Sequence, residues 1–160
     1  MKIICAVLIM TLFATTISGN AAEAKTKTTC KALCSAALKE TGGSANLKYA
    51  SKSALDFGAL SSSARKKVKT MQYVFDAKEA YSLCVMEAKN VSQAKSLLST
   101  LNSYKKRNCK SDYLSDYTAA EKRVFQNAVC GRKGKYVWYI AMSPKKNVNE
   151  KGQAALKKKL

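Results

Sequence analysis

The chain has 160 residues, with 29 Lys and Arg, 10 Asp and Glu and no His, so its formal net charge is +19. This balance favours anionic partners such as acidic glycans or anionic membrane surfaces. We do not expect nucleic acid to be the target, because the start of the chain, described next, indicates secretion. The lack of histidine removes the commonest acid–base group, and neither a GxSxG turn nor a phosphate-binding loop occurs. We therefore expect neither enzymatic activity nor a cofactor.

The first residues have the pattern of a secretory signal peptide. Met1 and Lys2 precede an apolar run from Ile3 to Ala14, and small residues follow between Ser18 and Ala24. The run is too short for a membrane span of about 20 residues, although an uncleaved anchor is the alternative. We expect a signal peptide over 1–21, a helical domain over 22–141 and a basic flexible tail over 142–160. The protein would then be secreted or at the cell surface, with no transmembrane span.

The first expected element of the domain is a helix over Thr28–Glu40, ended by Thr41-Gly42-Gly43-Ser44. Residues 45–63 read as a loop with a short helix around 50–60, and the serines at 61–63 offer a helix cap.

A long stretch without proline or glycine follows, and its apolar residues recur at spacings of three and four. They are Val74, Ala77, Tyr81, Cys84, Ala88, Val91, Ala94, Leu98 and Leu101. The spacing predicts one helix over most of Ser63–Arg107, roughly 60–70 Å long. We therefore expect an all-α fold: an elongated helical bundle on a long antiparallel coiled-coil hairpin, stapled by disulfides. The stripe serves as a core, as a seam for a partner chain, or both.

Downstream, Thr118 and Glu121 fit a capping box that opens a helix over Ala119–Cys130, stopped by Gly131. Aromatic and β-branched residues over Tyr136–Ala141 indicate a single strand.

The cysteines predict disulfides, because a signal peptide directs the chain to an oxidising compartment. Without Cys5 in the signal peptide, five remain: Cys30, Cys34, Cys84, Cys109 and Cys130. Five is odd, so one thiol is left free or pairs with another chain. Cys30 and Cys34 share one helix face, so each should bridge to a different segment. We expect Cys84 to be buried and bonded to one of them, because the first helix is the natural antiparallel neighbour of the long one. Metal binding is disfavoured without histidine.

Two kinds of binding or modification residues stand out. Basic clusters near the expected helix ends are candidate polyanion-binding residues: Lys105, Lys106, Arg107, Lys110, Arg132 and Lys133. Asn90-Val91-Ser92 is an N-glycosylation acceptor, which we expect on the long helix, where a glycan is added less readily than in a loop.

The segments Cys30-Lys31-Ala32-Leu33-Cys34 and Ala128-Val129-Cys130-Gly131 flank the long breaker-free stretch. Together they resemble the N-terminal domain of the variant surface glycoproteins of African trypanosomes. The resemblance implies a coiled-coil rod and a GPI-anchored homodimer acting as a non-catalytic coat in antigenic variation and immune evasion. The chain is much shorter than that domain and ends in Lys-Lys-Lys-Leu, with no GPI signal. We therefore expect a truncated or related member.

The alternative function is that of a soluble, cationic secreted protein that binds anionic glycans or membrane surfaces. Basic residues spread over the whole molecule would favour the coat, whereas one continuous basic face would favour the binding protein.

Overall fold

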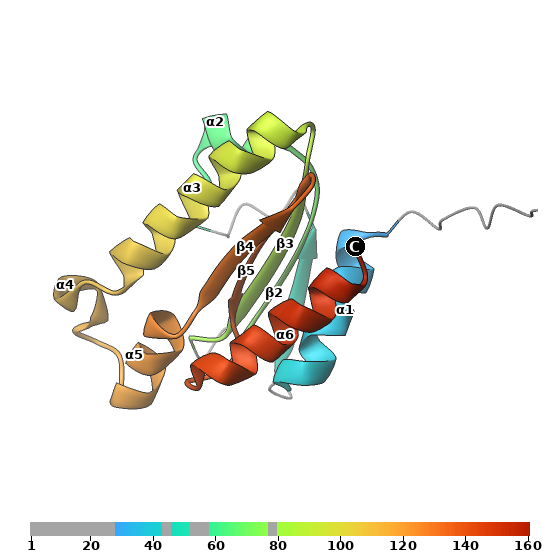
Figure 1. Ribbon diagram of the computed structural model, residues 1–160. Coiled ribbons are helices and arrows are strands. Elements are labelled where there is room, and N and C mark those ends of the chain that lie inside the picture. Colours follow the sequence, from blue (N-terminus) through green and yellow to red (C-terminus); the bar gives the residue numbers. More distant parts are fainter. Residues whose placement is uncertain (1–27, 43–45, 52–57, 77–79) are drawn as a thin grey trace, which may run out of the picture.

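The computed structural model describes residues 28–42, 46–51, 58–76 and 80–160. These form three layers, with helices on both faces of a central antiparallel sheet (Figure 1). The expected signal peptide lies outside the described residues. The predicted all-α coiled-coil bundle is wrong.

The sheet has five strands in the order β1-β2-β3-β5-β4, with every neighbouring pair antiparallel. Their bounds are β1 Leu47–Ser51, β2 Val68–Asp76, β3 Ser82–Ala88, β4 Val129–Lys133 and β5 Tyr136–Ala141. β1 and β4 are the edges, and β3 lies at the centre between β2 and β5. The strand predicted over Tyr136–Ala141 is confirmed as β5.

The predicted long helix is wrong: two strands interrupt it between Val68 and Ala88, and helix is found only at its start, up to Arg65, and from Val91 onward. β2 and β3 occupy its first half and form a hairpin, closed by the Asp76 amide donating to the Tyr81 carbonyl (3.0 Å). All seven residues of β3 are buried. Such a strand is covered on both faces and is apolar at most positions, from Leu83 to Met86 without a break, so a helical spacing of three and four fits it as well as an alternating one does.

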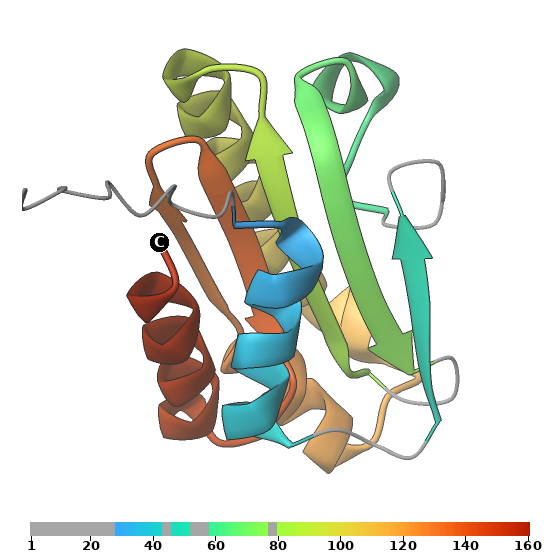
Figure 2. The same cartoon turned by 90° about the vertical axis from the view of Figure 1, so that its right-hand side faces the viewer.

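Helices α1 (Cys30–Thr41) and α6 (Lys146–Lys158) lie side by side on one face of the sheet (Figure 2). The Thr29 side chain caps α1 by accepting from the Ala32 amide (3.1 Å), and Gly42 ends it at a positive φ of 69°, so the predicted first helix is confirmed. Residues 142–160 do not form the flexible tail that we expected. Leu156 of α6 is fully buried, and this apolar contact holds the helix against the sheet.

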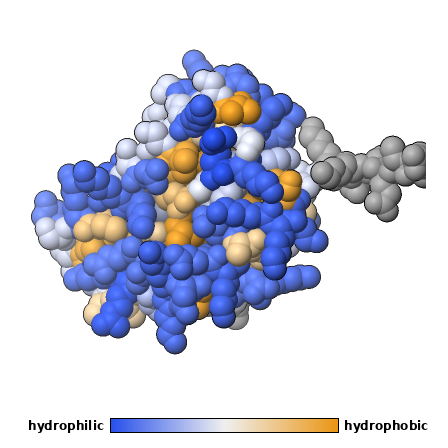
Figure 3. All heavy atoms as spheres, in the orientation of Figure 1, coloured by the Kyte–Doolittle hydropathy of each residue, from blue (hydrophilic) through white to orange (hydrophobic). Residues whose placement is uncertain are grey.

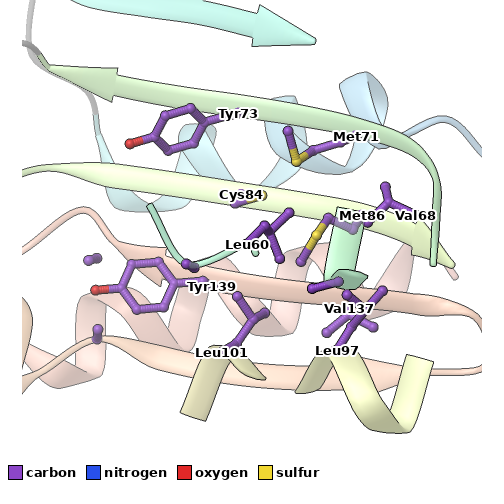
Figure 4. Packing of buried hydrophobic residues seen from close by; sticks show 14 of the residues in the cluster. Leu60, Val68, Met71, Tyr73, Cys84, Met86, Leu97, Leu101, Val137 and Tyr139 are labelled. Atoms are coloured by element: carbon purple, nitrogen blue, oxygen red, sulfur yellow. The ribbon is translucent and has the colours of Figure 1, made fainter. Parts of the chain in front are cut away.

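Helix α3 (Val91–Asn108) covers the opposite face of the sheet. Its Leu97 and Leu101 are fully buried and pack with Val137 and Tyr139 of β5 and with Met86 of β3 (Figure 4). Burying a leucine side chain contributes about 1.5–3 kcal/mol, so these contacts are a large part of what holds α3 on the sheet.

The shorter helices flank α3. They are α2 (Ser62–Arg65), α4 (Ser111–Leu114) and α5 (Ala119–Gln126). The predicted capping box at Thr118 and Glu121 is confirmed. The predicted continuation of that helix to Cys130 is wrong, because Val129 and Cys130 pair with β5 as part of β4. Likewise, Leu47–Ser51 is strand β1 where we expected a loop.

Asn149 of α6 is fully buried and ties three backbone groups together. Its side chain accepts from the Met142 amide and donates to the Ser143 and Asn127 carbonyls, each at 3.0 Å. These bonds fix the start of α6 to the end of β5 and to the turn before β4.

The coiled-coil rod that the resemblance to variant surface glycoproteins implied is therefore not the fold of the described residues. Membership of that family, and the coat function, stay predictions.

Candidate anion-binding site

Helix α3 has a polar stripe beside the buried stripe that contains Leu97 and Leu101. Asn90 caps the helix, its side chain accepting from the Gln93 amide (2.8 Å), and this sets the rotation of the first turn. Lys95, Ser99, Asn102 and Lys106 then recur at spacings of four, three and four, so they share one face of the helix. That face borders edge strand β4, because its residues line one hollow together with Arg132 of β4.

The hollow between this stripe and β4 is the candidate site, which we call the α3/β4 cleft. Its volume is about 470 Å³. Its lining residues are Lys95, Leu98, Ser99, Asn102, Ser103, Lys106 and Arg132. Three of them are cationic, three carry a hydroxyl or an amide, and none is acidic. The cleft therefore offers hydrogen-bond donors of positive charge to an anion.

Arg132 is the one lining residue that β4 supplies. It pairs with Val137 of β5, and its guanidinium donates to the Gly134 carbonyl (2.9 Å). Gly134 has a φ of +56°, so the tight β4–β5 turn presents this carbonyl without strain. This bond uses one end of the guanidinium and limits the rotation of the side chain, so less conformational entropy is lost when the remaining N–H groups bind a ligand.

The positive charge of the cleft is not neutralised within the described residues. The two ion pairs found there are Lys69–Glu87 (3.1 Å) and Lys146–Glu150 (3.6 Å), and neither involves a cleft residue. Figure 3 shows mostly hydrophilic residues on the face of the molecule seen in Figure 1, with hydrophobic ones in small separate patches.

The length of the cleft limits what can bind along it. Lys95 and Lys106 are 11 positions apart on one helix, which at 1.5 Å per residue is about 16 Å. The Debye length at physiological salt is about 8 Å, so one small anion cannot interact with both ends. An extended polyanion can, with its charged groups contacting successive cations.

The structure brings together only Lys106 and Arg132 of the six predicted polyanion-binding residues. The Arg107 guanidinium donates to the Gly58 carbonyl (3.2 Å) and lies over the Tyr104 ring. The Lys133 ammonium donates to the Lys157 carbonyl of α6 (3.2 Å).

The other two predicted basic residues do not line the cleft either. Lys105 lies close enough to Cys109 and Cys130 for its charge to oppose, in part, the rise that burial causes in the pKa of both thiols. Lys110 is exposed at the N-cap of α4. Lys95 was not among the predicted residues, although its helical spacing to Lys106 was a usable signal.

The structure contains none of the predicted disulfides, since all five cysteines of the described residues are free thiols. Cys84 is buried, as expected, but it sits on a strand and packs on the α3 side of the sheet. Cys30 and Cys34 pack on the α1 side, so the sheet separates them from Cys84. Burial raises the pKa of Cys34 and Cys84, and it raises that of Cys130 to about 11.

The predicted glycosylation residue Asn90 is exposed at the turn between β3 and α3 and not within a long helix. Its side-chain oxygen makes the capping bond, so a glycan on the amide nitrogen would leave that oxygen in place. Glycosylation stays a prediction.

The described ranges contain no cluster of three or more acidic or cysteine side chains arranged to hold a metal ion. None of their helices combines the length and apolar character that crossing a membrane requires. No family model, curated protein or solved structure matches the chain.

Proposed function

We propose that the protein is a cationic binding protein that holds an extended polyanion, such as a sulfated glycan, in the α3/β4 cleft. The main support for this proposal is that Lys95, Lys106 and Arg132 line one hollow that has no acidic lining residue. The net charge of +19 adds long-range attraction. The expected signal peptide would place the protein where such glycans occur.

Recognition would be electrostatic, and the affinity would depend on the length of the polyanion. Cations spaced over about 16 Å bind a chain of anionic groups through several weak contacts that add, while the cleft hydroxyls and amide donate further hydrogen bonds. Binding of this kind weakens steeply with salt, because each contact releases counterions from the polyanion. No bond of the ligand is made or broken.

The test is retention on immobilised heparin, compared between two variants of equal net charge. The cleft variant carries Lys95→Gln, Lys106→Gln and Arg132→Gln. The control carries Lys31→Gln, Lys48→Gln and Lys145→Gln, all exposed and none lining the cleft. We expect the cleft variant to elute at clearly lower salt than the control. A plot of its log affinity against log salt concentration should also be less steep, with the magnitude of the slope reduced by about 0.7–0.9 for each removed contact, as for nucleic acids.

Heparin fragments of increasing length provide a second readout. Affinity should rise with length until the fragment spans the distance between Lys95 and Lys106, about 16 Å, and then level off. Equal losses in both variants would show that only net charge matters and would refute the cleft as the site. Elution of the wild type at the salt concentration of a neutral protein would refute the function itself.

A further inference from the structure

A second hollow lies on the opposite side of the sheet, between the outer surfaces of α1 and α6. We call it the α1/α6 groove; its volume is about 710 Å³. Its lining residues from α1 are Ala32, Ser35, Ala36, Lys39 and Glu40. Those from α6 and its C-terminal end are Lys151, Ala154, Ala155, Lys158 and Lys159. Both sets follow the spacing i, i+3, i+4, i+7, i+8, so each helix contributes one continuous stripe.

The two helices are held rigidly enough to keep the groove open. A Cβ atom at Gly152 would lie 2.5 Å from Cγ2 of Thr41 and 3.2 Å from the Ala37 carbonyl oxygen, so α6 touches α1 closely there. At the other end, the Thr28 hydroxyl donates to the Lys159 carbonyl (3.0 Å). The helices run antiparallel (Figure 2), and contacts at both ends fix their spacing.

The groove combines a floor of small side chains with a basic rim. Four lysines face it, against the single carboxylate of Glu40. In the described part of the chain, no ion pair links any of these lysines to a carboxylate. The rim therefore carries uncompensated positive charge beside a surface that a partner backbone can approach closely.

We propose that the α1/α6 groove docks an acidic amphipathic helix of a partner protein. Two helices with matching stripes leave a furrow in which a third helix packs, and alanine floors allow close approach of its axis. Each stripe spans eight residue steps, about 12 Å, or a little over two helical turns. Glutamates or aspartates flanking the apolar stripe of the incoming helix would meet the lysine rim on both sides.

The groove chemistry separates this occupant from a lipid surface. Interfacial binding to a membrane relies on tryptophan, phenylalanine or leucine side chains that enter the acyl region. The lining of the groove contains none of these, and its apolar part is alanine. The surface is therefore suited to helix packing.

The test uses a fluorescently labelled peptide of about 18 residues, five helical turns at 3.6 residues per turn. Its leucine–alanine stripe repeats at i, i+3, i+4, i+7 and is flanked by glutamates; a twin peptide carries lysines in place of the glutamates. Anisotropy titrations should show that the acidic peptide binds and that the lysine twin does not.

Charge reversal in the protein makes the test specific to the groove. The groove variant Lys39→Glu/Lys158→Glu should weaken binding of the acidic peptide at least about tenfold and gain binding of the lysine twin. The matched control Lys48→Glu/Lys145→Glu reverses two exposed charges that line neither the groove nor the α3/β4 cleft, and it should leave peptide binding nearly unchanged. Ala36→Trp, which fills the floor without changing charge, should also weaken binding.

Three results would overturn the proposal. One is equal weakening by the groove and control variants, and another is no binding of either peptide. The third is binding of vesicles of phosphatidylcholine and phosphatidylglycerol, in equal amounts, that the groove variant abolishes while the acidic peptide fails to bind. Failure here leaves the heparin experiment unaffected, because the two sites use different residues on opposite sides of the sheet.

Discussion

Replacing Gly152 by alanine measures how closely α6 approaches α1. The added Cβ would lie 2.5 Å from Cγ2 of Thr41, whereas carbon atoms in contact prefer about 3.5–4.0 Å. Overpacking of this kind costs about 1–3 kcal/mol. Alanine is the better helix former by about 1 kcal/mol, which offsets part of that cost. We expect Gly152→Ala to lower the free energy of unfolding by up to about 2 kcal/mol.

A double-mutant cycle isolates the contact. Thr41→Ser removes Cγ2 but keeps the hydroxyl, which donates to the Ala37 carbonyl (3.1 Å). In that background the main clash is gone, so Gly152→Ala should be close to neutral or stabilise by up to about 1 kcal/mol. The coupling energy between the two substitutions should therefore equal the overpacking cost, about 1–3 kcal/mol, which is within the range seen for residues in contact.

Urea unfolding followed by fluorescence measures these energies, because the chain has a single tryptophan, Trp138, and it is fully buried. For a chain of this size, 1 kcal/mol corresponds to roughly 2–4 °C in the melting temperature. If Gly152→Ala stabilises the protein equally in both backgrounds, α6 does not approach α1 as closely as described, and the preformed groove loses its support.

Three further substitutions probe the core. Burial raises the pKa of the Cys130 thiol from its ordinary value of 9.0 to about 11, so between pH 9 and 11 this thiol ionises only in the unfolded state and by itself lowers stability by about 1.4 kcal/mol per pH unit. Denaturant titrations under reducing conditions should show that Cys130→Ala removes this part of the loss of stability, and an unchanged pH dependence would contradict the burial of the thiol. Asn149→Ala breaks three buried hydrogen bonds and should cost about 3 kcal/mol or more in urea unfolding, while Asn147→Ala at an exposed position should cost under about 0.5; equal costs would contradict the bonding described. Gly131→Ala places a Cβ 2.5 Å from the Trp138 ring and should destabilise by about 1–3 kcal/mol with a shift in tryptophan emission; unchanged emission would argue against this contact.

Local signals in the sequence predicted local structure well. The capping box at Thr118 and Glu121 and the helix stop at Gly42 are both confirmed, because each depends on atoms within a few residues of one another. The aromatic segment Tyr136–Ala141 forms a strand as its composition indicates. The two caps need no distant partner, and the β-propensity of the aromatic segment is likewise local, although the strand pairs with the distant β3.

The same reasoning failed for the long stretch, because the deciding contacts are distant. Cys84 and Val85 pair with Tyr139 and Trp138, more than 50 positions along the chain. Their side chains point to opposite faces of the sheet, and both faces are covered by helices. A period of apolar residues indicates an amphipathic element only when one of its faces meets water.

The sequence alone determined the net charge, because the excess of Lys and Arg is a property of composition. It also determined the ends of several elements, because helix caps act within one turn of a helix. Which cations act together was decided only by the tertiary structure. Lys106 and Arg132 lie 26 positions apart, and they line one cleft because β4 forms the sheet edge next to which α3 packs. That placement depends on hydrogen bonds between β4 and β5 and on the burial of Leu97 and Leu101, which are nonlocal interactions that no short window of sequence contains.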